Sequence, residues 1–315
     1  MGPFWQLGYS GTPGNGKANR VFAVGASPAI PGHDAGHAPC HAPAARRAAR
    51  RAALPAALPV DAPWNGPPVE ESVSHELLAL HFVWACTGPL PSRGNMRLTK
   101  LEHAALSIEK SGSRLFIDPG KFTTPITEAA GTVAIVITHE HDDHWTPEQL
   151  TRILSRNPRT PIFTTPSAAE KIIAADLPDI GEVIDVAAGE SVLVGGFDLQ
   201  FFGGEHAIIH SSIPRIENIG VLVERGALYY GGDAYVAPEG VDIDVLAVCA
   251  NAPWMRLAES MDYVERVRPK RVLPVHEMLL AKVGKTLAVT RLRESAVRVG
   301  ANLIDLQPFE TLELD

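Results

Sequence analysis

The sequence has few cysteines and no long apolar segment. Its 315 residues include three cysteines, Cys40, Cys86 and Cys249, which are far apart and form no Cys-x-x-Cys pair. This spacing argues against a disulfide framework and against a thiolate zinc site. No stretch approaches the roughly 18 apolar residues that a membrane helix requires, so we expect no membrane partner. A bound metal must therefore be held by histidine and aspartate.

Basic charge is also scarce in the part of the chain that resembles a folded domain. Residues 96–315 contain 21 lysines and arginines against 31 aspartates and glutamates, a net charge of −10. Nucleic-acid surfaces need a basic face to replace counterions, so this balance argues against a nucleic-acid partner. We expect a cytoplasmic protein that acts on a small molecule, and edge strands that can pair make a homo-oligomer feasible.

Residues 1–95 differ from the rest in composition. They hold 13 of the 26 prolines and an Ala/Arg tract over residues 42–59. Such a segment buries too little apolar surface to offset its chain entropy. We expect a disordered extension, a targeting peptide, or a start codon assigned too far upstream, in which case Met96 is the natural start. The group His33, His37, Cys40 and His41 has helical spacing, but intervening Gly36 and Pro39 argue against a metal site there.

From Met96 onward, apolar runs alternate with turns and helical patterns. The β-branched run at 133–138 predicts a strand buried on both faces. Thr146, Pro147 and Gln149 predict a helix start with a capping box. Helices are also expected near 257–267 and 285–299. Further strands are expected within 96–109 and at 161–165, 197–202, 219–224, 227–232, 244–250, 271–275 and 302–306.

A loop rich in histidine follows the strand at 133–138. THEHDDHW, residues 138–145, places three histidines and three acidic residues in eight positions. In an extended loop His139 and His141 project to one side and can bind one metal, while Asp143 and His144 reach a second about 3.5–4 Å away. His206, Asp233 and His276 also lie at or just beyond the ends of expected strands. These seven residues predict a di-metal site at one edge of a sheet.

These motifs resemble the metallo-β-lactamase superfamily of hydrolases. The resemblance rests on the HxHxDH loop, an early strand pair ending in FIDPG at 116–120, the later His206, Asp233 and His276, ANAPW at 250–254 and VLPVHE at 272–277. It covers residues 96–315 and is similar to the branch that includes ascorbate-6-phosphate lactonase-like proteins. It implies an α/β (α+β) fold, a four-layer αββα sandwich.

The same resemblance implies the roles of the metal ligands. His139, His141 and His206 would hold the first ion, and Asp143, His144 and His276 the second. Asp233 would bridge both ions together with a hydroxide. The ligand types suit two Zn²⁺ ions, although Mn²⁺ or Fe bind the same set.

The expected reaction is hydrolysis of a small ester, lactone or phosphoester by the bridging hydroxide, with Asp143 orienting the nucleophile and passing on its proton. An iron-dependent redox enzyme on the same fold is an alternative, but such members of the superfamily typically replace a motif histidine with a carboxylate or lack part of the second site, whereas all the hydrolase ligands are present here. A nuclease or phosphodiesterase is another, yet only 26 residues separate His206 from Asp233, too few for a basic insertion. A non-catalytic binding protein is the fourth interpretation.

Other residues near the motifs have less certain assignments. His103 is either a buried support or a substrate contact, and His210 either contacts a substrate oxygen or faces solvent. Asp118 is expected to hold a turn or to orient a ligand histidine. Family members usually have Pro in place of Asp142, Leu-Asp in place of Trp145-Thr146, and Ser or Thr in place of Ala234, which leaves the pocket shape open. Apolar pocket residues are expected at Phe122, Trp145, Pro214, Trp254 and Met278.

Overall fold

The computed structural model describes residues 23–24 and 95–314. The expectations for residues 1–95 therefore lie almost entirely outside the described residues, as does the group from His33 to His41. Strand β1 (Ala23–Val24) pairs in parallel with β8 (Ser191–Val194) at the edge of a sheet. The separation of residues 1–95 from the domain stays a prediction.

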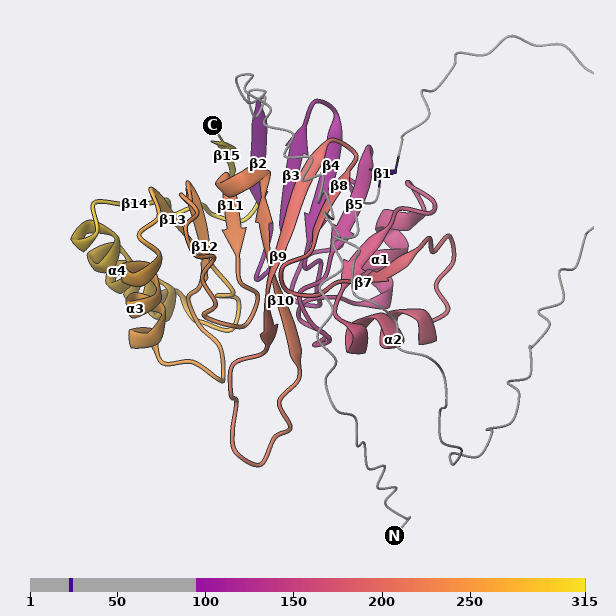
Figure 1. Ribbon diagram of the computed structural model, residues 1–315. Helices are drawn as coiled ribbons and strands as arrows, with labels where there is room; N and C mark the ends of the chain where they lie inside the picture. The colour runs from indigo at the N-terminus through magenta and orange to yellow at the C-terminus, as the bar shows by residue number, and fades with distance from the viewer. Residues whose placement is uncertain (1–22, 25–94, 315) are drawn as a thin grey trace, which may run out of the picture. The chain divides into compact units, whose positions relative to one another are not determined.

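Two sheets form the centre of the described chain (Figure 1). The first has the order β1-β8-β9-β10-β11-β12-β13-β14 and the second the order β15-β2-β3-β4-β5-β6-β7. The remaining strands of the first sheet are β9 (Phe197–Glu205), β10 (Glu217–Val223), β11 (Leu228–Tyr230), β12 (Val245–Cys249), β13 (Arg271–Val275) and β14 (Asn302–Leu303). Those of the second are β2 (Met96–Lys100), β3 (Leu106–Lys110), β4 (Ser113–Ile117), β5 (Thr132–Val136), β6 (Ile162–Thr164), β7 (Val183–Asp185) and β15 (Thr311–Leu314).

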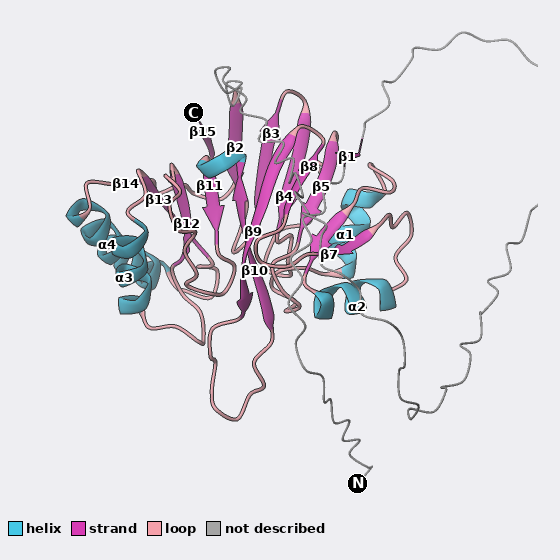
Figure 2. Ribbon diagram, viewed as in Figure 1, coloured by secondary structure: helices cyan, strands magenta, loops and turns pink. Residues whose placement is uncertain are grey.

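Helices cover the outer face of each sheet (Figure 2). Helices α1 (Pro147–Leu154) and α2 (Pro166–Ala174) pack on the second sheet, and α3 (Leu257–Val267) and α4 (Lys282–Arg298) on the first. A short 3₁₀ helix, Glu224–Gly226, joins β10 to β11. This is the expected αββα sandwich.

The sandwich follows from strands that are apolar on both faces. Along β12, Val245, Ala247 and Cys249 enter the apolar layer between the sheets, while Leu246 and Val248 pack beneath α3 and α4. Because successive side chains of a strand point to opposite faces, such a run must be covered on both sides. The strand β5 is buried in the same way, which is why the sequence at 133–138 predicted it.

Most expected elements are found, with boundary shifts of a few residues. The helix at 257–267 has the expected bounds, and α4 begins three residues before the expected start. Thr146 caps α1 by accepting a hydrogen bond from the Gln149 backbone N–H at 3.2 Å. The predicted return bond of the capping box, from the Gln149 side chain to the Thr146 backbone, is wrong. The Gln149 side chain is buried and forms hydrogen bonds with the backbone of Thr123 and Ile126 instead.

Within residues 96–315, one α-helix and three strands were not expected: α2, β7, β8 and β15. Helix α2 begins with Thr165 as its N-cap and Pro166 at its first position, the same Thr-Pro signal that opens α1. That signal was therefore available in the sequence. The three strands are short, two of them at sheet edges, and lack the long apolar run by which central strands are recognised. Within the described part of the chain, no helix is both long enough and apolar enough to cross a membrane.

Gly120 lies against the backbone of the histidine-rich loop. A Cβ atom added there would overlap the carbonyl oxygen of Asp143 and lie 2.6 Å from the His144 nitrogen. Lys121 N–H also donates to the Asp142 carbonyl at 2.8 Å, so this segment and the loop are in direct contact. The loop can lie this close to Gly120 only because glycine has no side chain.

We predict that Gly120→Ala lowers the free energy of unfolding by about 1–3 kcal/mol, because the added methyl group forces backbone apart. Chemical denaturation measures the change. Gly284→Ala in α4 is the control, since its methyl group meets only the side chain of Leu280. Equal stability of Gly120→Ala and the wild type would show that the loop does not depend on this contact.

Candidate metal centre

The functional side chains come from loops that leave both sheets and are joined by backbone hydrogen bonds. The motif loop follows β5, and its Thr138 carbonyl accepts from Ile219 N–H of β10 at 2.9 Å. Ala207 N–H donates to the Asp233 carbonyl at 2.8 Å, and His276 N–H to the His103 carbonyl at 2.8 Å. Segments far apart in sequence are thereby fixed around one buried centre.

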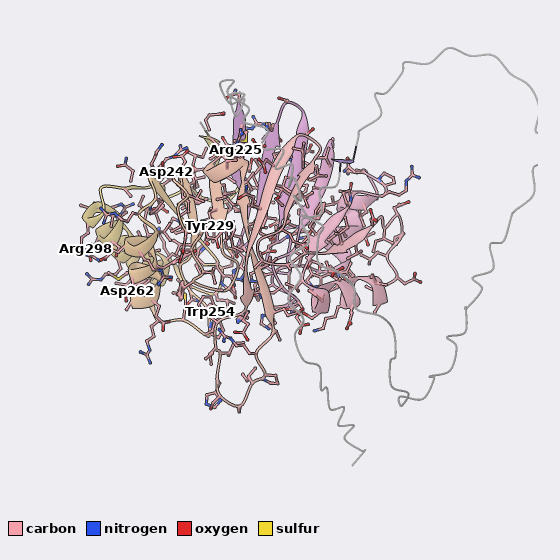
Figure 3. The ribbon with its side chains drawn as sticks, in the orientation of Figure 1. Arg225, Tyr229, Asp242, Trp254, Asp262 and Arg298 are labelled. Carbon is pink, nitrogen blue, oxygen red and sulfur yellow. The ribbon has the colours of Figure 1, made fainter. Side chains whose placement is uncertain are left out.

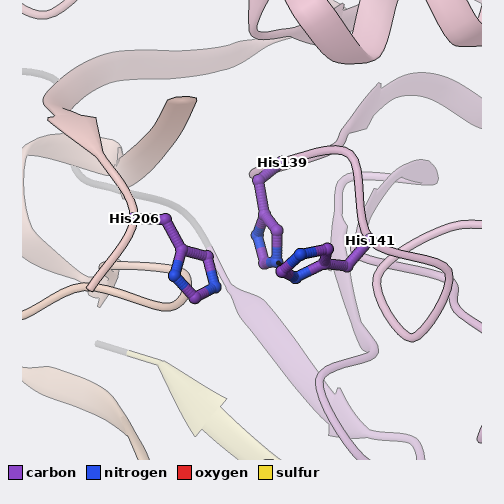
Figure 4. A group of neighbouring side chains, drawn as sticks. All are labelled: His139, His141 and His206. Carbon is purple, nitrogen blue, oxygen red and sulfur yellow. Dashed lines mark hydrogen bonds between the residues drawn. The ribbon is translucent and has the colours of Figure 1, made fainter. Parts of the chain in front are cut away.

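The first group of donors consists of His139, His141 and His206. Figure 4 shows the three rings turned toward a common point, with His206 approaching from a separate segment. Nε2 of His139 lies 3.0 Å from Nδ1 of His141. Nε2 of His206 is buried and has no hydrogen-bond partner among the described residues. The structure thus brings together the three residues that we expected to hold one ion.

The second expected set, Asp143, His144 and His276, is also brought together. Nε2 of His144 lies 3.3 Å from Nε2 of His276. Asp143 approaches both rings, with Oδ2 3.4 Å from His276 Nε2 and Oδ1 4.0 Å from His144 Nε2. All three side chains therefore face one another, although Asp143 does so through two different oxygens.

Asp233 lies between the two sets. Its Oδ1 is 3.4 Å from His144 Nε2, and its Oδ2 is 3.5 Å from Nε2 of both His206 and His276. The carboxylate is almost fully buried, with 3% of its side chain exposed. Asp233 is positioned to contact ions in both sets, which is the place expected for a bridging ligand.

Each of four histidines has its Nδ1 beside a hydrogen-bond acceptor. Nδ1 lies 2.6 Å from the Ala207 carbonyl in His206, 2.6 Å from the Asn251 carbonyl in His276 and 2.6 Å from Asp118 Oδ2 in His144. In His139 the partner is the Thr138 hydroxyl oxygen, at 3.0 Å. We assign the proton of each neutral ring to Nδ1 on this ground, which leaves Nε2 as a lone pair facing the centre. Converging lone pairs and carboxylates fit divalent cations.

Asp118 supports two of these rings. Its carboxylate accepts from the Thr138 N–H at 2.7 Å, from the Thr138 hydroxyl at 2.6 Å and from His144. Because the Thr138 hydroxyl proton goes to Asp118, the hydroxyl oxygen is free to accept from His139. Asp118 thereby orients His144 directly and His139 through Thr138.

His103 is buried beside Asp143 and His276 and forms a third group with them. Its proton is on the opposite ring nitrogen from that in the four histidines above, because Nδ1 of His103 accepts a hydrogen bond from the Met278 N–H at 3.3 Å. The proton is therefore on Nε2, which donates to Asp143 Oδ2 at 3.2 Å. His103 supports the Asp143 carboxylate and has no free lone pair for a metal.

Three residues of this centre have positive φ angles, namely His103 (58°), Asp118 (48°) and His276 (61°). Residues other than glycine rarely adopt this conformation, and each instance costs about 1–3 kcal/mol. The surrounding hydrogen bonds must offset that cost. Such strained residues are typical of functional sites.

The charges of the centre are strongly coupled. Burial would raise the pKa of Asp143, but hydrogen bonds from His103 and His276 outweigh burial and lower it. The pKa of Asp233 is also well below its usual value, since His144 and His276 outweigh the effect of burial. Burial lowers the pKa of His139, and neighbouring histidines lower it further. The two carboxylates are therefore ionised and His139 is neutral. For His144 and His276, burial lowers the pKa, but Asp233 and the other neighbouring carboxylates outweigh burial and raise the pKa of both, so a cation bound there would displace their protons.

Some expected residues lie elsewhere. His210 is exposed on the β9–β10 loop, where its Nδ1 pairs with the Ser212 hydroxyl at 2.7 Å. The expectation that Trp145 lines the pocket is wrong, because its ring packs in the apolar layer under α1. Its N–H donates to the Glu140 carbonyl at 3.3 Å. Trp145 is a core residue because its large apolar ring is buried among other apolar side chains.

Trp254 contacts the centre directly. This residue, labelled in Figure 3, lies in the segment between β12 and α3. Its indole N–H donates to Asp233 Oδ2 at 2.7 Å, and its ring stands edge-on to His206 with centroids 5.8 Å apart. Trp254 thus orients the carboxylate between the two sets. The sequence suggested only an apolar pocket residue here.

The chain is similar to several known proteins. The family model described as the β-lactamase superfamily domain matches residues 97–276. Protein Rv0786c of Mycobacterium tuberculosis is 36% identical over 203 residues, covering 63% of this chain and 92% of the relative. A UPF0173 metal-dependent hydrolase of Aeropyrum pernix is 28% identical over 206 residues, covering 57% of this chain and 81% of the relative.

A solved structure shows the same fold. Igni18, described as a novel metallo hydrolase from Ignicoccus hospitalis, superposes with a TM-score of 0.54 and 18% identity. The match covers 70% of this chain and 99% of that protein. At this identity the likeness concerns the fold alone.

We predict that Trp254→Phe weakens metal retention about 10- to 100-fold, because Asp233 loses the donor that orients it. Titration of the metal-loaded protein with a chelator measures the change. Tyr235→Phe is the control, since its hydroxyl contacts Ser260 and its ring packs on Trp254 without reaching Asp233. Equal retention in both variants would show that the indole N–H has no role in the centre.

Proposed function

The chain belongs to the metallo-β-lactamase superfamily, and from this premise we propose that it is a metal-dependent hydrolase with two divalent cations in its centre. The named relative from Aeropyrum pernix supports the hydrolase assignment. Zinc is the proposed metal because neutral imidazole and carboxylate ligands suit it. The proposed reaction is cleavage of a small ester, lactone or phosphoester.

The observation that carries this proposal is the buried Nε2 of His206. Within the described part of the chain this atom has no hydrogen-bond partner. Nδ1 of the same ring lies 2.6 Å from the Ala207 carbonyl and carries the proton, so Asp233 Oδ2, 3.5 Å from Nε2, finds no donor there. A buried polar atom without a partner costs about 1–3 kcal/mol unless something satisfies it. A cation held also by His139 and His141 would satisfy it.

We assign the second cation to Asp143, His144 and His276, with Asp233 shared between the two. Bound there, the cations would lower the pKa of a shared water and polarise the scissile carbonyl or phosphoryl oxygen. The role of the protein is to hold the ligands at fixed positions and in the correct protonation states. Asp118 and Trp254 serve this role through their hydrogen bonds to His144 and Asp233.

Asp143 is the residue to which we assign proton transfer. Its side chain is 19% exposed, against 3% for Asp233, so it is the more accessible carboxylate of the two. As a hydrogen-bond acceptor it would orient the attacking water and pass the proton on to the leaving group. The His103 N–H fixes the direction of this carboxylate.

We predict that Asp143→Asn lowers kcat for ester, lactone or phosphoester hydrolysis by about 10²- to 10⁴-fold, because the amide cannot accept the proton. The measurement is steady-state hydrolysis by the zinc-loaded protein across the three substrate types. Metal content is determined in parallel, so that loss of metal is distinguished from loss of proton transfer.

Asp142→Asn is the matched control. This neighbouring side chain is 67% exposed and pairs with Lys121, so the hydrolysis rates of the Asp142→Asn variant should stay within about twofold of the wild type. Equal kcat for Asp143→Asn and the wild type would contradict the assigned role. Absence of hydrolysis in the wild type, with iron bound, would favour redox chemistry instead.

A further inference from the structure

A small cavity adjoins the first group of histidines. Its volume is about 290 Å³, and His141 and His206 form part of its wall. The other lining residues are Glu140, Ala207, Ile208, Ile209, Ile213, Pro214, Arg215 and Ile216. A molecule in this cavity would be in direct contact with the centre.

Most of the wall comes from the loop between β9 and β10, which extends away from the sheets (Figure 1). This loop carries four isoleucines in the cavity wall, and two of them are unusually exposed for large apolar residues. Ile208 is 64% exposed and Ile213 is 47% exposed. Apolar side chains held in the open beside a reactive centre are typical of a ligand-binding surface.

The charged side chains in the wall are already engaged with other groups. Glu140 pairs with Lys171 at 2.8 Å. Arg215 pairs with Glu205 at 2.7 Å and donates through Nε to the His206 carbonyl at 2.7 Å. A phosphate group would need cationic donors in this wall, and desolvating it against isoleucine is unfavourable.

We propose that this cavity binds the aliphatic chain of a neutral carboxylic ester or lactone. The inference rests on the proposed hydrolase and narrows its substrate class. In the reaction, water adds its oxygen to the acyl carbon, the acyl C–O bond breaks, and the proton goes to the departing alkoxide oxygen. The isoleucines of the loop remove the chain from water while the carbonyl lies beside His141 and His206.

The volume limits the length of that chain. An apolar cavity of about 150 Å³ accommodates benzene, so a cavity of this size holds on the order of ten carbon and oxygen atoms. Each methylene that enters raises kcat/KM about fourfold, from the roughly 0.8 kcal/mol of its burial. The gain should end once the cavity is full.

The test is the dependence of kcat/KM on acyl chain length for the full-length, zinc-loaded protein. The substrates are p-nitrophenyl acetate, butyrate, hexanoate, octanoate and decanoate, with p-nitrophenyl phosphate and bis(p-nitrophenyl) phosphate for comparison. We expect kcat/KM to rise with chain length to about hexanoate or octanoate and then level off. The phosphoesters should be poorer than the hexanoate.

Two variants and a control assign the effect to the loop. Ile208→Ser and Ile213→Ser should each reduce the gain per methylene, because the polar side chain leaves part of the chain in contact with water. Ile173→Ser on α2 is the control, since this side chain is 60% exposed and lies outside the cavity wall. In this control variant, kcat/KM should rise with each methylene as much as in the wild type.

A second measurement does not depend on turnover. The ketone 2-octanone cannot be hydrolysed, and it should raise the thermal midpoint of the wild type more than acetone does at equal concentration. Ile213→Ser should reduce that difference. Equal shifts by the two ketones would overturn the proposal.

The outcomes separate this inference from the proposed function. If the protein hydrolyses esters but kcat/KM does not rise with chain length, or if it prefers phosphoesters, the aliphatic-chain proposal is wrong. The proposal that the protein is a hydrolase then still stands. No hydrolysis of any compound counts against the hydrolase itself, and the ketone measurement still tests the cavity. If the serine variants convert a dimer to a monomer without changing the gain, the loop is an interface between two copies and the proposal is wrong.

Discussion

The Nε2 atoms of His144 and His276 lie 3.3 Å apart inside the protein, and the Nδ1 partners of both rings assign the proton to the opposite side. Two bare lone pairs at this distance would repel each other, so a proton or a cation must lie between them. Burial lowers the pKa of both rings, but Asp233 and the other neighbouring carboxylates outweigh burial and raise it, so a proton is held here without metal and a divalent cation would replace it. In the first group, Nε2 of His139 likewise lies 3.0 Å from Nδ1 of His141. The fold is thus arranged to satisfy a cation at each position, and we expect metal binding and folding stability to be coupled.

The αββα architecture meets this requirement by bringing strand ends from two sheets together. The motif loop leaves β5 in one sheet, while the segments bearing Asp233 and His276 follow β11 and β13 in the other. The hydrogen bond from Ile219 N–H to the Thr138 carbonyl joins the two sheets at this point. Because both sheets pack on a shared apolar layer, the ligands follow supported strands, with His206 directly after the last residue of β9.

The sequence predicted the parts of this centre that depend on local pattern. Strand ends followed by histidine or aspartate identified all seven proposed ligands, and the β-branched run at 133–138 identified β5. Contacts that depend on tertiary structure could not be predicted from the sequence. The bond from Trp254 to Asp233 spans 21 residues, and the tautomer of His103 is set by Met278, 175 residues away. Trp145 was misplaced for the same reason, because an aromatic residue beside a motif fits a core as well as a pocket.

Metal content per chain, determined by element on the full-length protein purified without added metal, tests the central claim most directly. The account predicts about two divalent ions per chain, zinc before manganese. It also predicts that His206→Ala loses one of them and Asp233→Ala loses both. A wild-type protein that is folded and no richer in metal than Asp233→Ala would contradict it.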